Sequence, residues 1–147
     1  MSKITQKEYE KDFYAWIIHN AQLLREGRVS EIDVENIAEE MESMGKSEKR
    51  ALASRLAVLM AHLLKWKYQP MRRSKSWVIT IKNQRRELID LLEESPSLKK
   101  ELEEKFKHIY EKGVGLASAE TGIDEEAFPH RPPFSLKDCL RTSYLPD

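Results

Sequence analysis

The chain has 147 residues, of which 40% are hydrophobic and 34% are charged, enough for one hydrophobic core and no more. No apolar stretch approaches the roughly 20 residues that span a bilayer, which excludes a transmembrane class. The 25 basic and 25 acidic residues balance, so no global field attracts nucleic acid or an anionic membrane. The N-terminus lacks the apolar segment of a signal peptide, and a lone Cys139 cannot form an internal disulfide, so we expect a soluble, cytoplasmic protein.

Apolar residues recur along the chain at helical spacing, without the sustained alternation of a half-buried strand. This pattern predicts five helices, at about 5–25, 33–44, 47–69, 75–94 and 96–121. Four of the six prolines lie at or beyond Pro129, so an irregular strap is expected over 123–147. The predicted fold is all-α: a single compact bundle of about five helices, forming one domain over residues 1–147, with a Pro-rich C-terminal strap.

The first two predicted helices have recognisable ends. Thr5 and Glu8 have the spacing of a capping box, and Gly27 follows the helix at 5–25. Asp33 is expected to cap the helix at 33–44, and Gly45 to end it in the left-handed conformation. The expected core faces are Phe13, Trp16, Ile17, Asn20 and Leu24 in the first helix, and Val34, Ile37, Ala38, Met41 and Met44 in the second.

The helix at 47–69 is the expected centre of the fold. Its residues 56–64 are apolar except for His62, so the helix should be enclosed on most sides until Pro70 ends it. In the last long helix, Ser95 and Pro96 are interpreted as the cap and the first helical residue, and Gly122 as the end. The strap has too many apolar residues for a free tail, and we expect these to lie on the bundle: Phe128, Phe134, Leu136, Leu140, Tyr144 and Leu145.

Several motifs that would indicate an enzyme are incomplete or missing. Gly45-Lys46-Ser47 resembles the end of a phosphate-binding loop, but Glu40 replaces the required first glycine and a helix precedes it. No histidine has a glutamate three residues earlier, as a ferritin-like di-metal site requires, and paired-cysteine zinc patterns and Gly-x-Ser-x-Gly are absent from the sequence. The sequence therefore predicts no metal and no cofactor, and it leaves an enzyme open without favouring one.

A basic segment over residues 65–86 is the strongest local signal. It contains eight basic and no acidic residues: Lys65, Lys67, Arg72, Arg73, Lys75, Lys82, Arg85 and Arg86. Cations neutralise phosphates and aromatic faces stack on unpaired bases, so the segment suits nucleic acid or a protein partner. The residues expected to contact the partner are Arg72, Arg73, Lys75, Lys82, Arg85 and Arg86, with Tyr68 as the exposed aromatic side chain. Trp66 and Trp77 lie at core positions, where simple packing is the more common role.

An acidic segment offers a simpler explanation of this basic one. Residues 31–48 contain seven acidic residues, Glu31, Asp33, Glu35, Glu39, Glu40, Glu42 and Glu48, against Lys46 alone. The two segments can pair within the chain or remain solvated, because charge runs on helices are usually solvated faces.

His62 is the third candidate, as the one polar residue of an otherwise apolar stretch. A buried histidine needs a partner, and Asn20, Gln84 and Glu120 each stand where an apolar residue would continue a helix stripe. One interpretation is a proton-transfer or metal site in which His62 and Arg55 converge with Glu39, Glu42 or Glu120. The other, which we favour, is a hydrogen-bonded core network that fixes the helix register.

Several segments carry a family resemblance. They are residues 10–16 (Glu-Lys-Asp-Phe-Tyr-Ala-Trp), 36–47 (Asn-Ile-Ala-Glu-Glu-Met-Glu-Ser-Met-Gly-Lys-Ser), 62–70 (His-Leu-Leu-Lys-Trp-Lys-Tyr-Gln-Pro) and Ser76-Trp77. Together they resemble the domain-of-unknown-function family 29 (DUF29) over nearly the whole chain. The resemblance implies a compact helical domain found in cyanobacteria and other bacteria, with no established activity. Arg131 precedes Pro132 where family members often have a cysteine, which argues against a thiol role there.

These observations favour a binding or interaction module, with nucleic acid or a protein as the partner of the basic segment. Two alternatives stay open: an uncharacterised enzyme or metal site around His62, and a structural protein that self-associates through a leftover apolar face. The oligomeric state and the order of the helices in space do not follow from the sequence.

Overall fold

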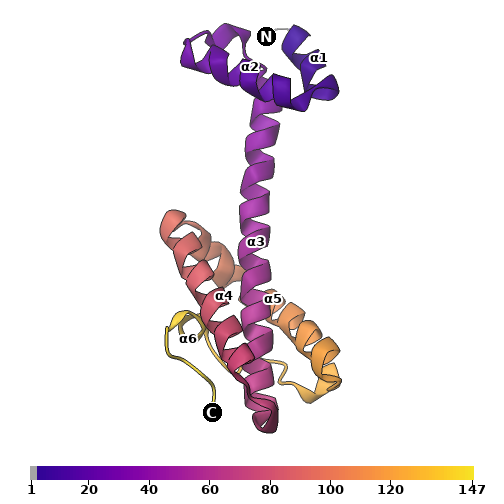
Figure 1. Cartoon of the computed structure of the whole chain (residues 1–147), viewed down its shortest axis with the longest axis vertical. Coiled ribbons are helices and arrows are strands. Elements are labelled where there is room, and N and C mark those ends of the chain that lie inside the picture. Colours follow the sequence, from indigo (N-terminus) through magenta and orange to yellow (C-terminus); the bar gives the residue numbers. More distant parts are fainter. Residues whose placement is uncertain (1–2) are drawn as a thin grey trace. The chain divides into compact units, whose positions relative to one another are not determined.

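The structure, a computed structural model, describes residues 3–147 and the side chains from Lys7 onward. Over this range it contains six α-helices, three short 3-10 helices and no strand, so the predicted all-α class is confirmed (Figure 1). The chain divides into two compact units, Met1–Ser47 and Glu48–Asp147, which we call the N-terminal and C-terminal units. None of the described helices is both long and apolar enough to span a membrane. A single domain over 1–147 stays a prediction.

The N-terminal unit begins with two helices where one was predicted over 5–25. They are α1 (Lys3–Lys11) and α2 (Phe13–Arg25), followed by the 3-10 helix η1 (Val29–Glu31). The prediction of one helix is wrong because Asp12 leaves the helical conformation and its carboxylate accepts a hydrogen bond from Ala15 N at 3.1 Å, which starts a new helix. The capping box predicted at Thr5 lies outside the described side chains. Gly27 follows α2 with a φ of 72°, as expected.

The core of this unit is small. Trp16, Leu23 and Ile32 are its buried hydrophobic residues, and Tyr9 of α1 packs edge-on against Trp16 with 4.8 Å between ring centroids. The expected core face of the first helix is wrong in part, since Phe13, Ile17 and Leu24 are exposed. The buried line of α2 is instead Trp16, Asn20 and Leu23, which has the i, i+4, i+7 spacing of one helical face.

The longest helix, α3 (Val34–Tyr68), replaces the two helices predicted at 33–44 and 47–69. Gly45 does not end a helix, because its φ is not positive and the helical backbone continues through it. Strong helix formers on both sides, such as Met44 and Lys46, compensate for its low propensity. Of the stripe predicted to be core, Val34, Met41 and Met44 are exposed. Pro70 follows the end of α3, and Asp33 accepts from Asn36 N at its start, as predicted.

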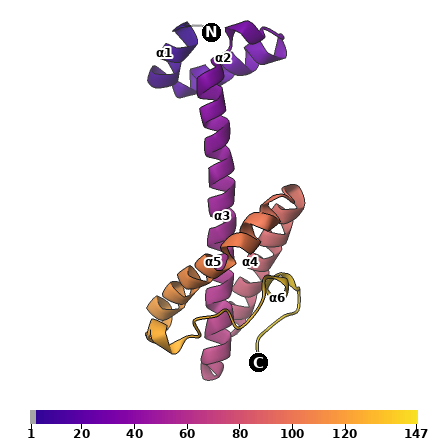
Figure 2. The same cartoon turned by 180° about the vertical axis from the view of Figure 1, so that it is seen from behind.

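The C-terminal unit contains the remainder of α3 with α4 (Lys75–Glu94), α5 (Leu98–Thr121) and α6 (Leu136–Leu140). The 3-10 helices η2 (Pro70–Arg72) and η3 (Glu125–Ala127) connect them. Figures 1 and 2 show α4 and α5 along this part of α3, whose leucines fill the space between them. Leu52, Leu56, Leu59 and Leu63 are at most 1% exposed, so the enclosed central helix is confirmed for this unit.

The limits of α4 and α5 test the capping predictions. The predicted span 75–94 matches α4. Helix α5 begins at Leu98 rather than at residue 96, because Ser95 ends α4 by donating its N–H to Leu91 O and residues 96–97 form a turn. Gly122 ends α5 with a φ of 78°, which is the left-handed cap that the sequence indicates.

The strap after Gly122 runs back over the C-terminal unit to α6 (Figure 2). Phe128 and Phe134 are buried, and Leu136, Leu140 and Tyr144 pack against the same core, while Leu145 is 37% exposed. Ser135 and Asp138 form the capping box that starts α6. The prediction that the strap lies on the bundle is confirmed.

Candidate interaction surface

The exposed face of α4 presents a line of cations. Lys75, Lys82 and Arg86 are exposed and stand at i, i+7 and i+11, which places them on one side of the helix. Among the described residues, none of the three is in an ion pair. Like charges four residues apart repel each other, so Lys82 and Arg86 raise the electrostatic energy of the free helix.

Apolar side chains interleave with these cations. Ile79 is 56% exposed on the same line, and Val78 beside it is 38% exposed. Met71 of η2 is 96% exposed immediately before α4. We call the exposed set the basic surface: Met71, Arg72, Arg73, Lys75, Val78, Ile79, Lys82 and Arg86.

Helix polarity adds to the positive potential at one end of this surface. The first turn of α4 contains no acidic residue and begins with Lys75, and Arg72 and Arg73 precede it. A helix N-terminus has a partial positive charge, so cations there are unfavourable and an anion is favourable. The sequence thus places positive charges at the N-terminus of α4, where they destabilise the helix.

The aromatic side chains of the segment are already in contact with other residues. The Arg73 guanidinium lies 4.7 Å from the centroid of Trp66, and Arg73 Nε donates to Trp66 O at 2.8 Å. Tyr68 is 37% exposed, and its ring meets Phe128 edge-on at 5.5 Å. A base that stacked on Trp66 would have to displace Arg73.

Lys65 belongs to the interior rather than to the basic surface, and Trp77 beside it is half-buried. Lys65 is 9% exposed; its Nζ donates to Glu120 Oε2 at 2.8 Å and lies 4.9 Å from the centroid of Trp77. This pairing uses Glu120 from α5, so Glu120 is not a partner of His62. The pairing of the acidic segment 31–48 with the basic segment stays a prediction.

Arg85 is the clearest correction among the predicted contact residues. It is 3% exposed, between Ile81 and Leu88 on the buried face of α4. Its guanidinium donates to Cys139 O at 2.7 Å, Thr142 O at 3.0 Å and Tyr144 O at 2.9 Å. Burial lowers the pKa of Arg85. The side chain fixes the strap and cannot contact a partner.

The polar site predicted around His62 does not form in the C-terminal unit. His62 is half-buried, and its Nδ1 lies 3.0 Å from Val58 O, the carbonyl one turn earlier in its own helix. Arg55 donates to Gln84 Oε1 at 3.4 Å and lies 4.0 Å from Glu87 Oε2. Glu120 accepts from Lys65, so His62, Arg55 and Glu120 each contact a different residue instead of one another. No group of three or more His, Cys, Asp or Glu among the described residues has a geometry suited to a metal ion.

The other members predicted for that site lie in the N-terminal unit. Glu39 and Glu42 are exposed on α3, and Asn20 is buried beside Asp33. Asn20 Oδ1 accepts from Asp33 N at 2.9 Å, so Asn20 is part of a local network instead of a partner of His62.

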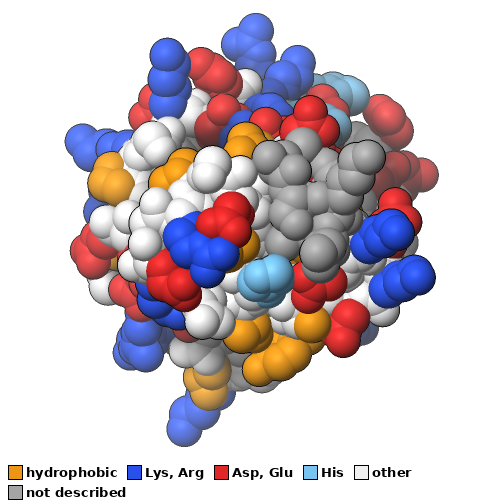
Figure 3. Space-filling view, turned by 90° about the horizontal axis from the view of Figure 1, so that it is seen from above, with side chains coloured by type: hydrophobic (Ala, Val, Ile, Leu, Met, Phe, Trp, Pro, Cys, Tyr) orange, Lys and Arg blue, Asp and Glu red, His pale blue; other side chains and the backbone are white. Residues whose placement is uncertain are grey.

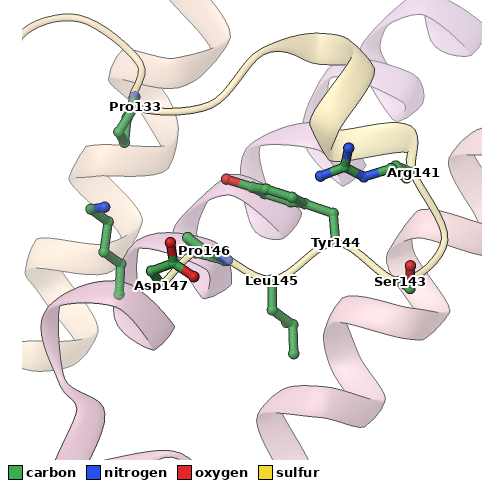
Figure 4. Close-up of a pocket in the computed structure, with 8 residues that line it drawn as sticks. Pro133, Arg141, Ser143, Tyr144, Leu145, Pro146 and Asp147 are labelled. Atoms are coloured by element: carbon green, nitrogen blue, oxygen red, sulfur yellow. The ribbon is translucent and has the colours of Figure 1, made fainter.

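A pocket of about 470 Å³ opens at the end of the strap (Figure 4). Its charged groups are Lys67, Arg141 and Asp147, and the Arg141 guanidinium lies 5.0 Å from the centroid of Tyr144. Residues 141–147 form most of its wall, so the pocket depends on the hydrogen bonds with which Arg85 holds the strap.

A family model described as a domain of unknown function, DUF29, matches residues 8–145. The chain belongs to the DUF29 family. The match includes residues of both units, from α1 to the end of the strap, so the family resemblance seen in the sequence is confirmed. No curated protein and no solved structure matches the DUF29 chain. Membership therefore assigns no activity, ligand or partner.

The DUF29 chain also contains a buried polar network that the sequence did not indicate as a unit. Trp16 Nε1 donates to Asp33 Oδ2 at 3.0 Å, Asn20 Nδ2 donates to Trp16 O at 2.9 Å, and Asn36 Nδ2 donates to Asp33 Oδ2 at 2.8 Å. This network ties α2 to the start of α3 within the N-terminal unit. A signal for Asp33 was its position as a helix cap, but its contact with Trp16, 17 residues away, has no local signature.

Proposed function

We propose that this DUF29 chain is a binding module whose basic surface binds an acidic surface of a protein. The observation that carries the proposal is the exposed line of Lys75, Ile79, Lys82 and Arg86, where cations and an apolar side chain share one helical face. Protein interfaces combine an apolar centre with a polar rim, and opposite charges across them speed encounter and select the partner.

The surroundings of the aromatic side chains favour a protein over nucleic acid. Single-stranded nucleic acid is bound by aromatic faces open for stacking, as well as by cations. Here Arg73 covers Trp66 and Phe128 contacts Tyr68. Exposed Met71, Val78 and Ile79 instead present aliphatic groups, which suit the apolar stripe of an acidic helix.

Binding to two fluorescent probes tests the proposal. One probe is a helical peptide with glutamate and leucine on one face, and the other is random single-stranded RNA, each titrated from low to high salt. The test variant replaces three surface cations, Arg72→Glu, Lys82→Glu and Arg86→Glu. Arg73 is left intact because it holds Trp66. The control is Lys99→Glu with Lys100→Glu, which reverses exposed charges at the start of α5, outside the basic surface.

We expect the acidic peptide to bind the wild type and the control, and the test variant to bind it at least about tenfold more weakly, the equivalent of 1.4 kcal/mol. RNA binding with a slope of about 0.7 log units per phosphate contact, abolished in the test variant, would replace the protein partner with nucleic acid. Equal peptide binding by the test variant and the control would remove the basic surface from the function.

A further inference from the structure

The N-terminal unit has an exposed face that complements the basic surface. On α3, Val34, Ala38 and Met41 form an apolar line at i, i+4 and i+7, with Val34 54% and Met41 62% exposed. Glu35, Glu39 and Glu42 run beside it at the same spacing and are also exposed. We call these six residues the acidic face. Among the described residues, none of its three carboxylates is in an ion pair, so their repulsion is unrelieved.

The N-terminal unit leaves an unusual amount of apolar surface uncovered. Among the described residues, nine of the fifteen exposed large hydrophobic side chains lie between Phe13 and Met44, against three buried ones, Trp16, Leu23 and Ile32. In Figure 3, hydrophobic side chains reach the surface beside acidic and basic ones. If each exposes about half of a side-chain area of roughly 150–200 Å², the nine present roughly 800 Å² together. Summed over the unit, this is about the area that each partner contributes to a stable protein interface.

The two units have opposite net charges. Residues 1–47 include six basic and ten acidic residues, a net charge of −4, and residues 48–147 include nineteen basic and fifteen acidic residues, a net charge of +4. The net charge of zero for the whole chain is therefore the sum of an acidic unit and a basic unit. Opposite patches attract over about 8–10 Å at physiological salt, which favours contact between an acidic and a basic unit.

The charges on the two surfaces also match in spacing. Glu35 and Glu42 are seven residues apart on one helix, and Lys75 and Lys82 are seven residues apart on another. At 1.5 Å per residue, each pair spans about 10 Å. Two antiparallel helices would therefore oppose both glutamates to both lysines, with Glu39 opposite Ile79, and would place the apolar line of the acidic face beside Val78.

We propose that the acidic face of one copy of this chain binds the basic surface of a second copy, and reciprocally, in a two-fold dimer. This inference rests on the proposed function and names the partner as the chain itself. Each surface is exposed within its own unit, so neither is covered by the helices of that unit. Two-fold symmetry forms the same contact twice, which doubles the buried area and neutralises both patches.

Sedimentation equilibrium of the full chain at several salt concentrations measures the assembly. The expected mass is twice the 17.2 kDa of the chain, with dissociation as salt rises. Two variants reverse one side of the contact each: Glu35→Lys with Glu42→Lys, and Lys75→Glu with Lys82→Glu. Each alone should weaken the dimer at least tenfold. Mixed in equal amounts they should form a heterodimer, because each contact then again joins opposite charges. The controls are Lys99→Glu with Lys100→Glu, and Glu103→Lys with Glu104→Lys.

Three results would overturn the inference: a mass of 17.2 kDa at every concentration, a dimer that neither reversal weakens, or a mixture that stays dissociated. Circular dichroism of each variant separates loss of assembly from loss of folding. A chain that is monomeric yet binds the acidic peptide through its basic surface would refute the dimer and keep the proposed function. A monomeric chain that binds no acidic peptide would refute both.

Discussion

Replacing Arg85 with methionine should release the C-terminal strap. The side chain is 3% exposed and donates to three backbone carbonyls, those of Cys139, Thr142 and Tyr144. A hydrogen bond that involves a charged group contributes about 1.5–3 kcal/mol, so three of them contribute roughly 4–9 kcal/mol. The substitution also removes the cost of burying a guanidinium, which is several kcal/mol. We expect a net loss of about 3 kcal/mol in the free energy of unfolding.

Thermal unfolding followed by circular dichroism measures this loss, and Arg86→Met is the matched control. Arg86 is the next residue of the same helix but is exposed, so its replacement should change the free energy of unfolding by less than about 0.5 kcal/mol. For a unit of about 100 residues, 3 kcal/mol corresponds to a Tm lower by roughly 12–24 °C. Limited proteolysis of Arg85→Met should cut first within residues 129–147. If the two variants melt together and resist protease equally, the strap does not depend on Arg85.

Two further predictions concern single positions. Gly45→Ala should raise the free energy of unfolding by about 1 kcal/mol, because Gly45 is exposed inside α3 and nothing lies within 4 Å of an added Cβ. Gly113→Ala should instead lower it by about 1–3 kcal/mol, because a Cβ added there would lie 3.1 Å from both Ala57 O and Met60 Cβ. A urea titration measures both changes. Burial raises the pKa of Cys139 from 9.0 to about 12, so the folded thiol should not react with an aromatic disulfide reagent at pH 8, and fast labelling without denaturant would contradict its burial. Since the folded pKa is the higher one, the neutral thiol contributes stability below pH 9 that is lost as the pH rises from 9 to 12.

The sequence predicted the C-terminal unit well because its signals are local and mutually consistent. Leu52, Leu56, Leu59 and Leu63 repeat at the spacing of one helical face, and the structure buries all four. Pro70 follows the end of α3 because proline has no backbone N–H to donate, and Gly122 ends α5 because glycine readily adopts the left-handed conformation. Arg85 was misplaced although a local signal existed, since it stands between Ile81 and Leu88 on the buried stripe. Its place on this stripe favours burial, whereas its positive charge favours exposure.

The candidate site around His62 failed for a different reason. The sequence identified polar residues at core positions, but which of them meet depends on tertiary packing. Glu120 meets Lys65, 55 residues away, and Gln84 meets Arg55, 29 residues away. His62 Nδ1 lies 3.0 Å from the carbonyl oxygen of Val58 in the preceding turn, so this ring nitrogen has a local partner.

The wrong predictions of core residues in the N-terminal unit are all of one kind: residues expected to be buried are exposed. Phe13, Ile17, Val34 and Met41 were all predicted to be buried, and all are exposed. Hydrophobic periodicity reports that a helical face favours burial, and it does not report what covers that face. The N-terminal unit has only three buried hydrophobic residues among those described, yet α3 exposes a stripe with the pattern of a core. Such a stripe resembles one side of a protein–protein interface. The periodicity of α3 therefore indicates a tendency to be buried, although these positions are exposed in the chain itself. In the dimer that we propose, a second copy of the chain would cover them.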